Sequence, residues 1–178
     1  KIVKITKKKK QNFFASYSLV RTMRAGILVL GALVAKHQKS ITSLPGGCLI
    51  GARPVNYHLN ALKKLGMKYD IKKGYIHAHT KEKLKGAKIR FSKISVGATE
   101  NTIIAACLAN GITILRNCAI EPEIIDLINF LKSGGAKIKF IGKRTVKIEG
   151  IKSLESTSYS VMSDRIETGT FCVAACLT

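Results

Sequence analysis

The stretch "NFLKSGGAK" at residues 129–137 repeats the pattern of "NALKKLGMK" at residues 60–68, and this repetition decides the fold. The two stretches are 69 residues apart, and so are the two copies of "AACL" at residues 105–108 and 174–177. Equal spacing of separate short motifs indicates tandem structural units. We therefore expect one nearly complete unit, a second complete unit and the start of a third.

Each unit predicts the same order of elements. An apolar helix such as residues 99–110 ends at Gly111, and the short strand "ITILRN" follows. A second helix has a proline near its start and ends at a glycine such as Gly66. Two alternating strands, "AKIKFIG" and "RTVKIEG", complete the unit, and Asp164 with Glu167 has the spacing of a capping box for the next helix. This order predicts a pseudo-threefold α/β domain with helices inside and sheets outside.

Composition excludes a disordered chain, because 46% of the 178 residues are hydrophobic. Lysine and arginine number 31 against 10 acidic residues, a formal net charge of +21 that attracts polyanions. The lysines alternate with isoleucine, as in "KIKFIGKRTVKI", which is typical of the solvent faces of strands. A lysine-rich surface is the favoured interpretation, and a binding site for nucleic acid or an anionic membrane is the alternative.

The N-terminal third raises the question of targeting. A lysine run precedes the apolar residues 26–35, but Arg21 and Arg24 interrupt the pattern and ten residues are too few to span a membrane. We expect a buried helix in a soluble, cytoplasmic protein, with a basic segment at 1–16 and a domain at 17–178. Because the chain begins with Lys1 and ends within an apolar run, we also expect a piece of a longer protein.

The five cysteines predict neither a disulfide scaffold nor a metal site. Their number is odd, and they include no C-x2-C pair that a histidine or cysteine pair could complete. Cys107 and Cys176 lie in apolar helical sequence, which predicts two buried thiols. No cofactor is expected.

The loop after the first long strand differs between the units. It reads "SLPGGCLIGARPVN" at residues 43–56 and only "NCAIEPEI" at 117–124. The longer loop places Cys48 after two glycines and five residues before Arg53. An insertion on a shared scaffold is the expected place for function.

Five stretches, "LVRTMRA", "SLPGGCLIGARPV", "KISVGAT", "EPEI" and "DRIETGTF", carry a resemblance over residues 17–178. They resemble the UDP-N-acetylglucosamine 1-carboxyvinyltransferase family, and the P-G-G-C-x-I-G-x-R-P motif is highly specific. The resemblance implies a partial domain of an inside-out α/β barrel of the enolpyruvyl transferase type, built from βαβαββ units. It also implies transfer of the enolpyruvyl group of phosphoenolpyruvate to the 3-hydroxyl of UDP-N-acetylglucosamine, the first committed step of peptidoglycan synthesis.

The same resemblance implies residue roles. Cys48 would deliver the proton to C3 of phosphoenolpyruvate from a loop that its glycines allow to move. Arginines would hold the anionic substrates. The stretch "SKISVGAT" at residues 92–99 predicts a strand that runs into a Gly-Ala-Thr turn and a helix, whose N-terminus suits phosphate. The implied substrate-binding residues are Arg24, Arg53, Pro54, Val55, Asn56, Tyr57, Lys93, Ile94, Ser95 and Val96. His58 also falls at a family position, with a half-exposed structural histidine as the alternative.

Two departures from the family pattern affect the expected site. Asn56 stands where the family has aspartate, and Ile120 replaces the usual arginine. The family's lysine–asparagine pair, catalytic aspartate and two further arginines have no counterpart in this sequence, so the isolated chain is expected to be inactive. The expected partners are the two small substrates, without a specific nucleic acid or a membrane. The alternative function is a non-catalytic basic remnant that binds polyanions.

Overall fold

The computed structural model describes residues 2–6, 12–46 and 55–178, which include two four-stranded sheets. The first sheet has the order β1-β2-β4-β3 and the second β5-β6-β8-β7. In both, the first strand pairs in parallel and the other pairs are antiparallel. The strands are β1 (Phe14–Ala15), β2 (Lys39–Ser43), β3 (Lys68–Lys72), β4 (Tyr75–His79), β5 (Lys88–Arg90), β6 (Ile112–Arg116), β7 (Lys137–Gly142) and β8 (Thr145–Glu149).

Helices alternate with these strands in the expected order. They are α1 (Tyr17–Val20), the 3-10 helix η1 (Arg24–Ile27), α2 (Leu28–His37), α3 (Asn56–Lys64), α4 (Val96–Ala106), α5 (Pro122–Ser133) and α6 (Arg165–Leu177). Each sheet, with the helices between its strands, therefore forms one βαβαββ unit. The prediction of repeated βαβαββ units is confirmed, and the assignment of residues after 164 to the start of a third unit stays a prediction. The boundary predicted between residues 16 and 17 stays a prediction, although β1 already pairs with β2.

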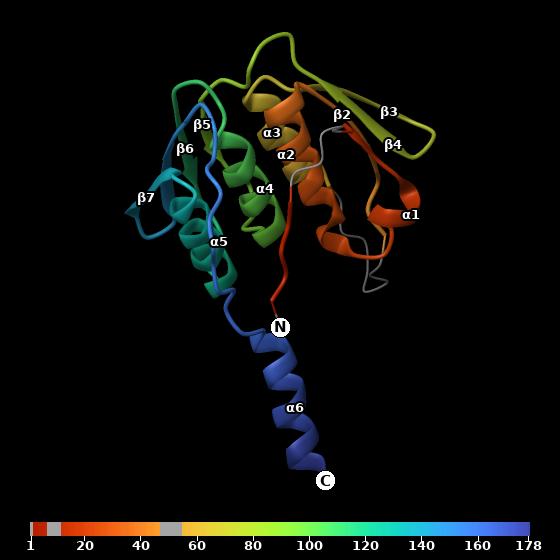
Figure 1. The fold of residues 1–178 in the computed structure, drawn as a ribbon, viewed down its shortest axis with the longest axis vertical. Coiled ribbons are helices and arrows are strands. Elements are labelled where there is room, and N and C mark those ends of the chain that lie inside the picture. The colour runs from red at the N-terminus through yellow and green to blue at the C-terminus, as the bar shows by residue number, and fades with distance from the viewer. Residues whose placement is uncertain (1, 7–11, 47–54) are drawn as a thin grey trace.

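The core lies where the helices of the two units meet between the sheets (Figure 1). Leu30 and Val34 of α2, Leu62 of α3 and Ile103 of α4 are fully buried there. Each such side chain contributes about 1.5–3 kcal/mol of transfer free energy. The predicted buried helix at residues 26–35 is confirmed, because α2 supplies part of this core.

The outer strands carry lysine on their solvent side. In β7, Ile138 is buried while Lys137 and Lys139 are exposed, and in β8 Val146 and Ile148 are buried. This alternation confirms that the lysine–isoleucine pattern belongs to the faces of strands. None of the helices in the described ranges is long and apolar enough to cross a membrane.

Two predicted boundaries were wrong around α4. The helix begins at Val96 rather than residue 99, because the Oγ of Ser95 accepts the backbone N–H of Ala98 and caps it there. It ends at Ala106 rather than residue 110. Residues 93–95, expected to be a strand, are irregular, and the strand β5 lies just before them.

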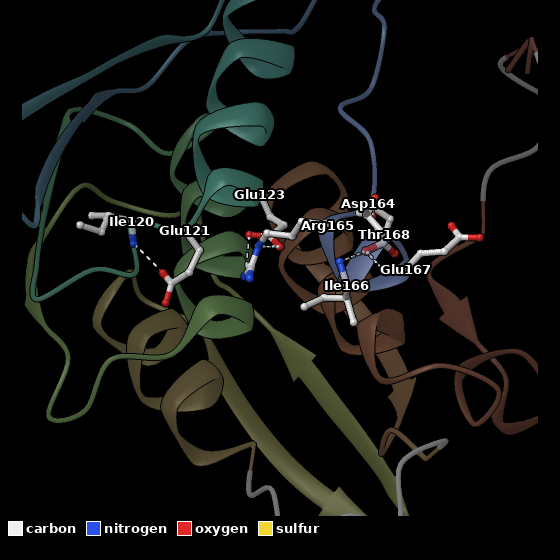
Figure 2. Close-up of polar contacts among 8 residues, drawn as sticks. All are labelled: Ile120, Glu121, Glu123, Asp164, Arg165, Ile166, Glu167 and Thr168. Atoms are coloured by element: carbon white, nitrogen blue, oxygen red, sulfur yellow. Dashed lines mark hydrogen bonds and ion pairs between the residues drawn. The ribbon is translucent and has the colours of Figure 1, made fainter. Parts of the chain in front are cut away.

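The last helix, α6, projects from the two units (Figure 1). Asp164 caps it by accepting the N–H groups of Ile166 and Glu167, as the capping pattern predicts. A two-bond ion pair ties its start to α5: Arg165 Nε and one terminal nitrogen lie 2.9 and 3.4 Å from the Glu123 carboxylate oxygens (Figure 2). No residue of α6 is buried, so the prediction of a buried Cys176 was wrong.

Candidate functional site

The described site residues lie at the starts of three helices. Arg24 is the first residue of η1, Asn56 and Tyr57 open α3, and Ser95 caps α4. Helix starts carry free N–H groups and a partial positive charge, both of which favour anions. The predicted residues Cys48, Arg53 and Pro54 lie outside the described residues.

His58 brings these three helix starts together. Its ring is 5% exposed, and its Cε1 and Nε2 lie against Gly97, where an added Cβ would be 3.2 and 3.5 Å away. Burial first, and then the charge of Arg24, lowers the pKa of His58 to about 4. The ring is therefore neutral near pH 7 and lies within electrostatic reach of Arg24. The alternative of a half-exposed histidine was wrong.

The start of α4 is fixed by a short chain of hydroxyl contacts. Thr99 Oγ1 donates to the carbonyl of Ser95 at 2.8 Å and accepts the N–H of Ala119 at 3.2 Å. Thr99 is fully buried, and its bonds join α4 to the loop that precedes α5. Through Thr99, the carbonyl of Ser95 is therefore held by the loop between β6 and α5 of the same unit.

A cavity of about 450 Å³ adjoins this region, between α3 and β5. Tyr57 and Lys64 line it from α3, and Arg90, Phe91 and Ser92 line it from the strand and the residues after it. The lining also includes Lys63 and has no acidic residue. Such a basic, partly aromatic groove attracts an anion that carries a flat ring.

Asn56 exposes its side chain at the start of α3. Its Oδ1 accepts the N–H of Tyr57 at 3.0 Å, and no acidic residue occupies the first turn of this helix. Val55 and Tyr57 are half-buried beside it, while Lys93 and Ile94 are exposed. The first turn of α3 therefore carries no negative charge that would repel a phosphate group.

The two buried thiols, Cys107 and Cys118, are unsuited to acid–base work at neutral pH. Burial raises the pKa of Cys107 to about 12 and that of Cys118 to about 11. The predicted buried thiol at Cys107 is confirmed, since the residue is 0% exposed. Among residues 2–6, 12–46 and 55–178, no group of three or more His, Cys, Asp or Glu side chains could hold a metal ion.

Sequence reasoning missed Asn101 and Thr99. Both are fully buried polar residues of α4, within an otherwise apolar helix. The run "ATENTIIAA" contained the signal: a polar amide next to two threonines, at positions where an amphipathic helix would have apolar side chains. A polar residue on a buried helix face requires partners, and here those partners belong to the site.

Comparison with known proteins gives one family over the whole chain. The EPSP synthase (3-phosphoshikimate 1-carboxyvinyltransferase) family matches residues 1–178. A relative from Pelagibacter ubique, named UDP-N-acetylglucosamine 1-carboxyvinyltransferase, is 63% identical over 99% of this chain and 42% of its own length. A relative of the same name from Pseudoalteromonas atlantica is 55% identical over 94% of this chain and 40% of its own length. The chain thus spans about two fifths of the curated relatives it matches.

Solved structures support the same fold. The enolpyruvyl transferase NikO from Streptomyces tendae matches with a TM-score of 0.72 and 22% identity, covering 89% of this chain and 38% of that one. An EPSP synthase from Acinetobacter baumannii matches with a TM-score of 0.67 and 18% identity, covering 89% and 35%. At these identities the likeness concerns the fold, and it confirms a partial domain of the enolpyruvyl transferase type.

Proposed function

The chain belongs to the EPSP synthase family, and from that premise we propose that it forms part of an enzyme that transfers the enolpyruvyl group of phosphoenolpyruvate to the 3-hydroxyl of UDP-N-acetylglucosamine. The names of the relatives at 63% and 55% identity support this choice of acceptor. We place the reaction in the cytoplasm at the start of peptidoglycan synthesis, and hence in cell-wall growth and division. The relatives are longer than this chain, so the proposal concerns the full-length protein.

The observation that carries the proposal is the convergence of three helix starts around His58. Arg24, the start of α3 and the start of α4 bring a guanidinium and the positive ends of two helix dipoles to one region. A nucleoside diphosphate fits this arrangement, because its phosphates take the helix starts and its base takes the basic groove beside Tyr57. The exposed Lys93 adds a cation at the same place.

The reaction proceeds by addition and elimination. The catalytic aspartate that the resemblance implies for the full-length protein takes the proton of the sugar 3-hydroxyl, and the sugar oxygen bonds to C2 of phosphoenolpyruvate. The thiol of Cys48 gives its proton to C3, which becomes a methyl group. The tetrahedral adduct then loses phosphate from C2, and a proton of C3 returns to the Cys48 thiolate, which restores the double bond in the product. Cys48 must begin this sequence as a thiol, so a pKa near the working pH suits its role.

The test is phosphate release from phosphoenolpyruvate by the full-length protein. We expect release to require UDP-N-acetylglucosamine and to be lost in Cys48→Ala. Cys172→Ala is the matched control, since Cys172 is exposed on α6, the helix that projects from the two units in Figure 1. Release without the sugar nucleotide, or full activity in Cys48→Ala, would contradict the proposal.

A second measurement tests the thiol directly. Fosfomycin, an epoxide phosphonate that resembles phosphoenolpyruvate, should label Cys48 before any other cysteine in the full-length protein. Cys107 and Cys118 are buried with raised pKa values and should stay unlabelled. Mass mapping after limited reaction gives the order, and faster labelling of Cys107 would contradict the assignment of the reactive thiol.

A further inference from the structure

Asn101 is a polar side chain in the middle of the core. It is 0% exposed and lies on α4 where that helix faces α2 and α3. A buried amide without partners costs several kcal/mol, so its hydrogen bonds determine whether it can be accommodated. Every partner that the structure gives to its side chain lies on another helix.

Two of those partners are backbone groups of one helical turn. Asn101 Oδ1 accepts the N–H of Gly31 at 3.0 Å, and its Nδ2 donates to the carbonyl of Ile27 at 3.1 Å. These two groups are four residues apart, the spacing of an α-helical hydrogen bond, and they lie where η1 passes into α2. The amide therefore braces the turn that follows Arg24.

The third partner is His58. Asn101 Nδ2 lies 3.1 Å from His58 Nδ1. The two backbone contacts fix the orientation of the amide, because an N–H can only donate and a carbonyl can only accept. The amide nitrogen therefore faces the ring and donates, so Nδ1 must accept and the proton of the neutral ring lies on Nε2.

This arrangement fixes the ring at the site. The Nε2 edge lies against Gly97 in the first turn of α4, next to residues 93–96. A protonated ring would carry a hydrogen on Nδ1 that opposes the amide N–H, and its charge would be repelled by Arg24. Asn101 thus favours a neutral ring beside Arg24.

We propose that Asn101 is a positioning residue for the candidate site: its amide holds His58 as the Nε2–H tautomer and braces the turn after Arg24, which sets the geometry in which the sugar nucleotide binds. The part that concerns the sugar nucleotide rests on the proposed function. The part that concerns His58 does not, and the two parts have separate measurements.

The first measurement is nitrogen NMR of the full-length protein labelled in its histidines, with His58→Asn to assign the resonance. We expect a neutral ring with its proton on Nε2 near pH 7. In Asn101→Asp the carboxylate accepts from Nδ1, so Nδ1 becomes protonated and the pKa of His58 rises. A wild-type ring with its proton on Nδ1, or a charged ring, would overturn the proposal without any variant of Asn101.

The second measurement is steady-state kinetics of Asn101→Asp against Thr102→Val. Thr102 is the matched control, because its buried hydroxyl donates to the carbonyl of Ala98 within α4 and not to another helix of the described chain. We expect the KM for UDP-N-acetylglucosamine to rise about tenfold in Asn101→Asp, which is the effect of losing about one hydrogen bond, and to stay near wild type in Thr102→Val. An equal rise in both variants would show a general loss of packing and overturn the positioning role. A wild-type protein without turnover would refute the proposed function and leave the NMR result to decide the role of Asn101 toward His58.

Discussion

Acid should destabilise this fold through His58 in particular. The ring is neutral when folded because burial and Arg24 lower its pKa from 6.5 to about 4. The unfolded chain binds a proton below pH 6.5 and the folded chain does not, so stability is complete above that pH and is lost as pH falls toward 4. At about 1.4 kcal/mol for each pKa unit, the full loss is about 3 kcal/mol.

The measurement is urea unfolding at a series of pH values for wild type and His58→Asn. Asparagine places its Oδ1 near the position of Nδ1, so it still accepts from Asn101 but does not titrate. Between about pH 7.5 and about pH 4.5, wild type should lose about 2.5 kcal/mol more than the variant. Carboxyl groups that titrate in the same range are common to both proteins. Glu100, whose pKa is raised by burial and by Glu123, is one of them, and its contribution cancels in the difference.

Parallel pH curves for the two proteins would refute this reasoning. They would mean that His58 accepts a proton in the folded state as readily as in the unfolded chain. Burial of the ring, its bond to Asn101 and its closeness to Arg24 would then not describe the molecule.

Four further outcomes follow from packing, chemistry and charge. Leu62→Ala should lower the free energy of unfolding by about 2–5 kcal/mol, because the side chain is fully buried, and denaturant titration measures this loss. Gly31→Ala should destabilise the fold and lower its melting temperature, because the new Cβ would lie 2.8 Å from a backbone oxygen of α4. A neutral maleimide should modify the exposed Cys172 first and should modify Cys107 only after the protein unfolds. Mass spectrometry of samples taken during the reaction measures the order. Asn56→Asp should tighten UDP-N-acetylglucosamine binding by calorimetry, since a charge-assisted bond is worth about 1.5–3 kcal/mol against about 1 for a neutral one.

The repeat made most of the fold predictable from sequence. The end of α3 at Gly66 was correct because this glycine directly follows the cap Leu65 with a φ of +105°, which other residues avoid. Gly111 also has a positive φ, +88°, but α4 ends before it, at Ala106. The start of α4 was misplaced because its cap is the hydroxyl of Ser95, a weaker signal than the apolar run that follows. A helix boundary can be predicted from sequence when few residue types can adopt the backbone conformation or make the cap that it requires.

The candidate site was predictable only in part. The sequence motifs predicted that Arg24 and residues at the starts of α3 and α4 belong to the site. The structure shows that these residues lie at helix starts, and their roles in binding stay predictions. Asn101 was missed because its partners lie 43 to 74 residues away along the chain. Cys176 was misjudged because apolar helical sequence predicts a buried face without showing what covers it, and α6 has no buried residue in this structure. The spacing of apolar residues predicts which face of a helix can be buried, whereas the neighbouring elements determine whether that face is buried.

The lysines of β3 and β7 oppose edge-to-edge pairing of sheets between copies of this chain. Both strands are the last in their sheets, so their outer backbone groups have no neighbouring strand among the described residues. Such edges add strands from other molecules and lead to aggregation unless charge or irregularity prevents it. Lys68 and Lys72 are the first and last residues of β3, while Lys137 and Lys139 lie on β7, whose register is also irregular near Gly142. Part of the large positive charge therefore keeps the open edges of two sheets from joining one another.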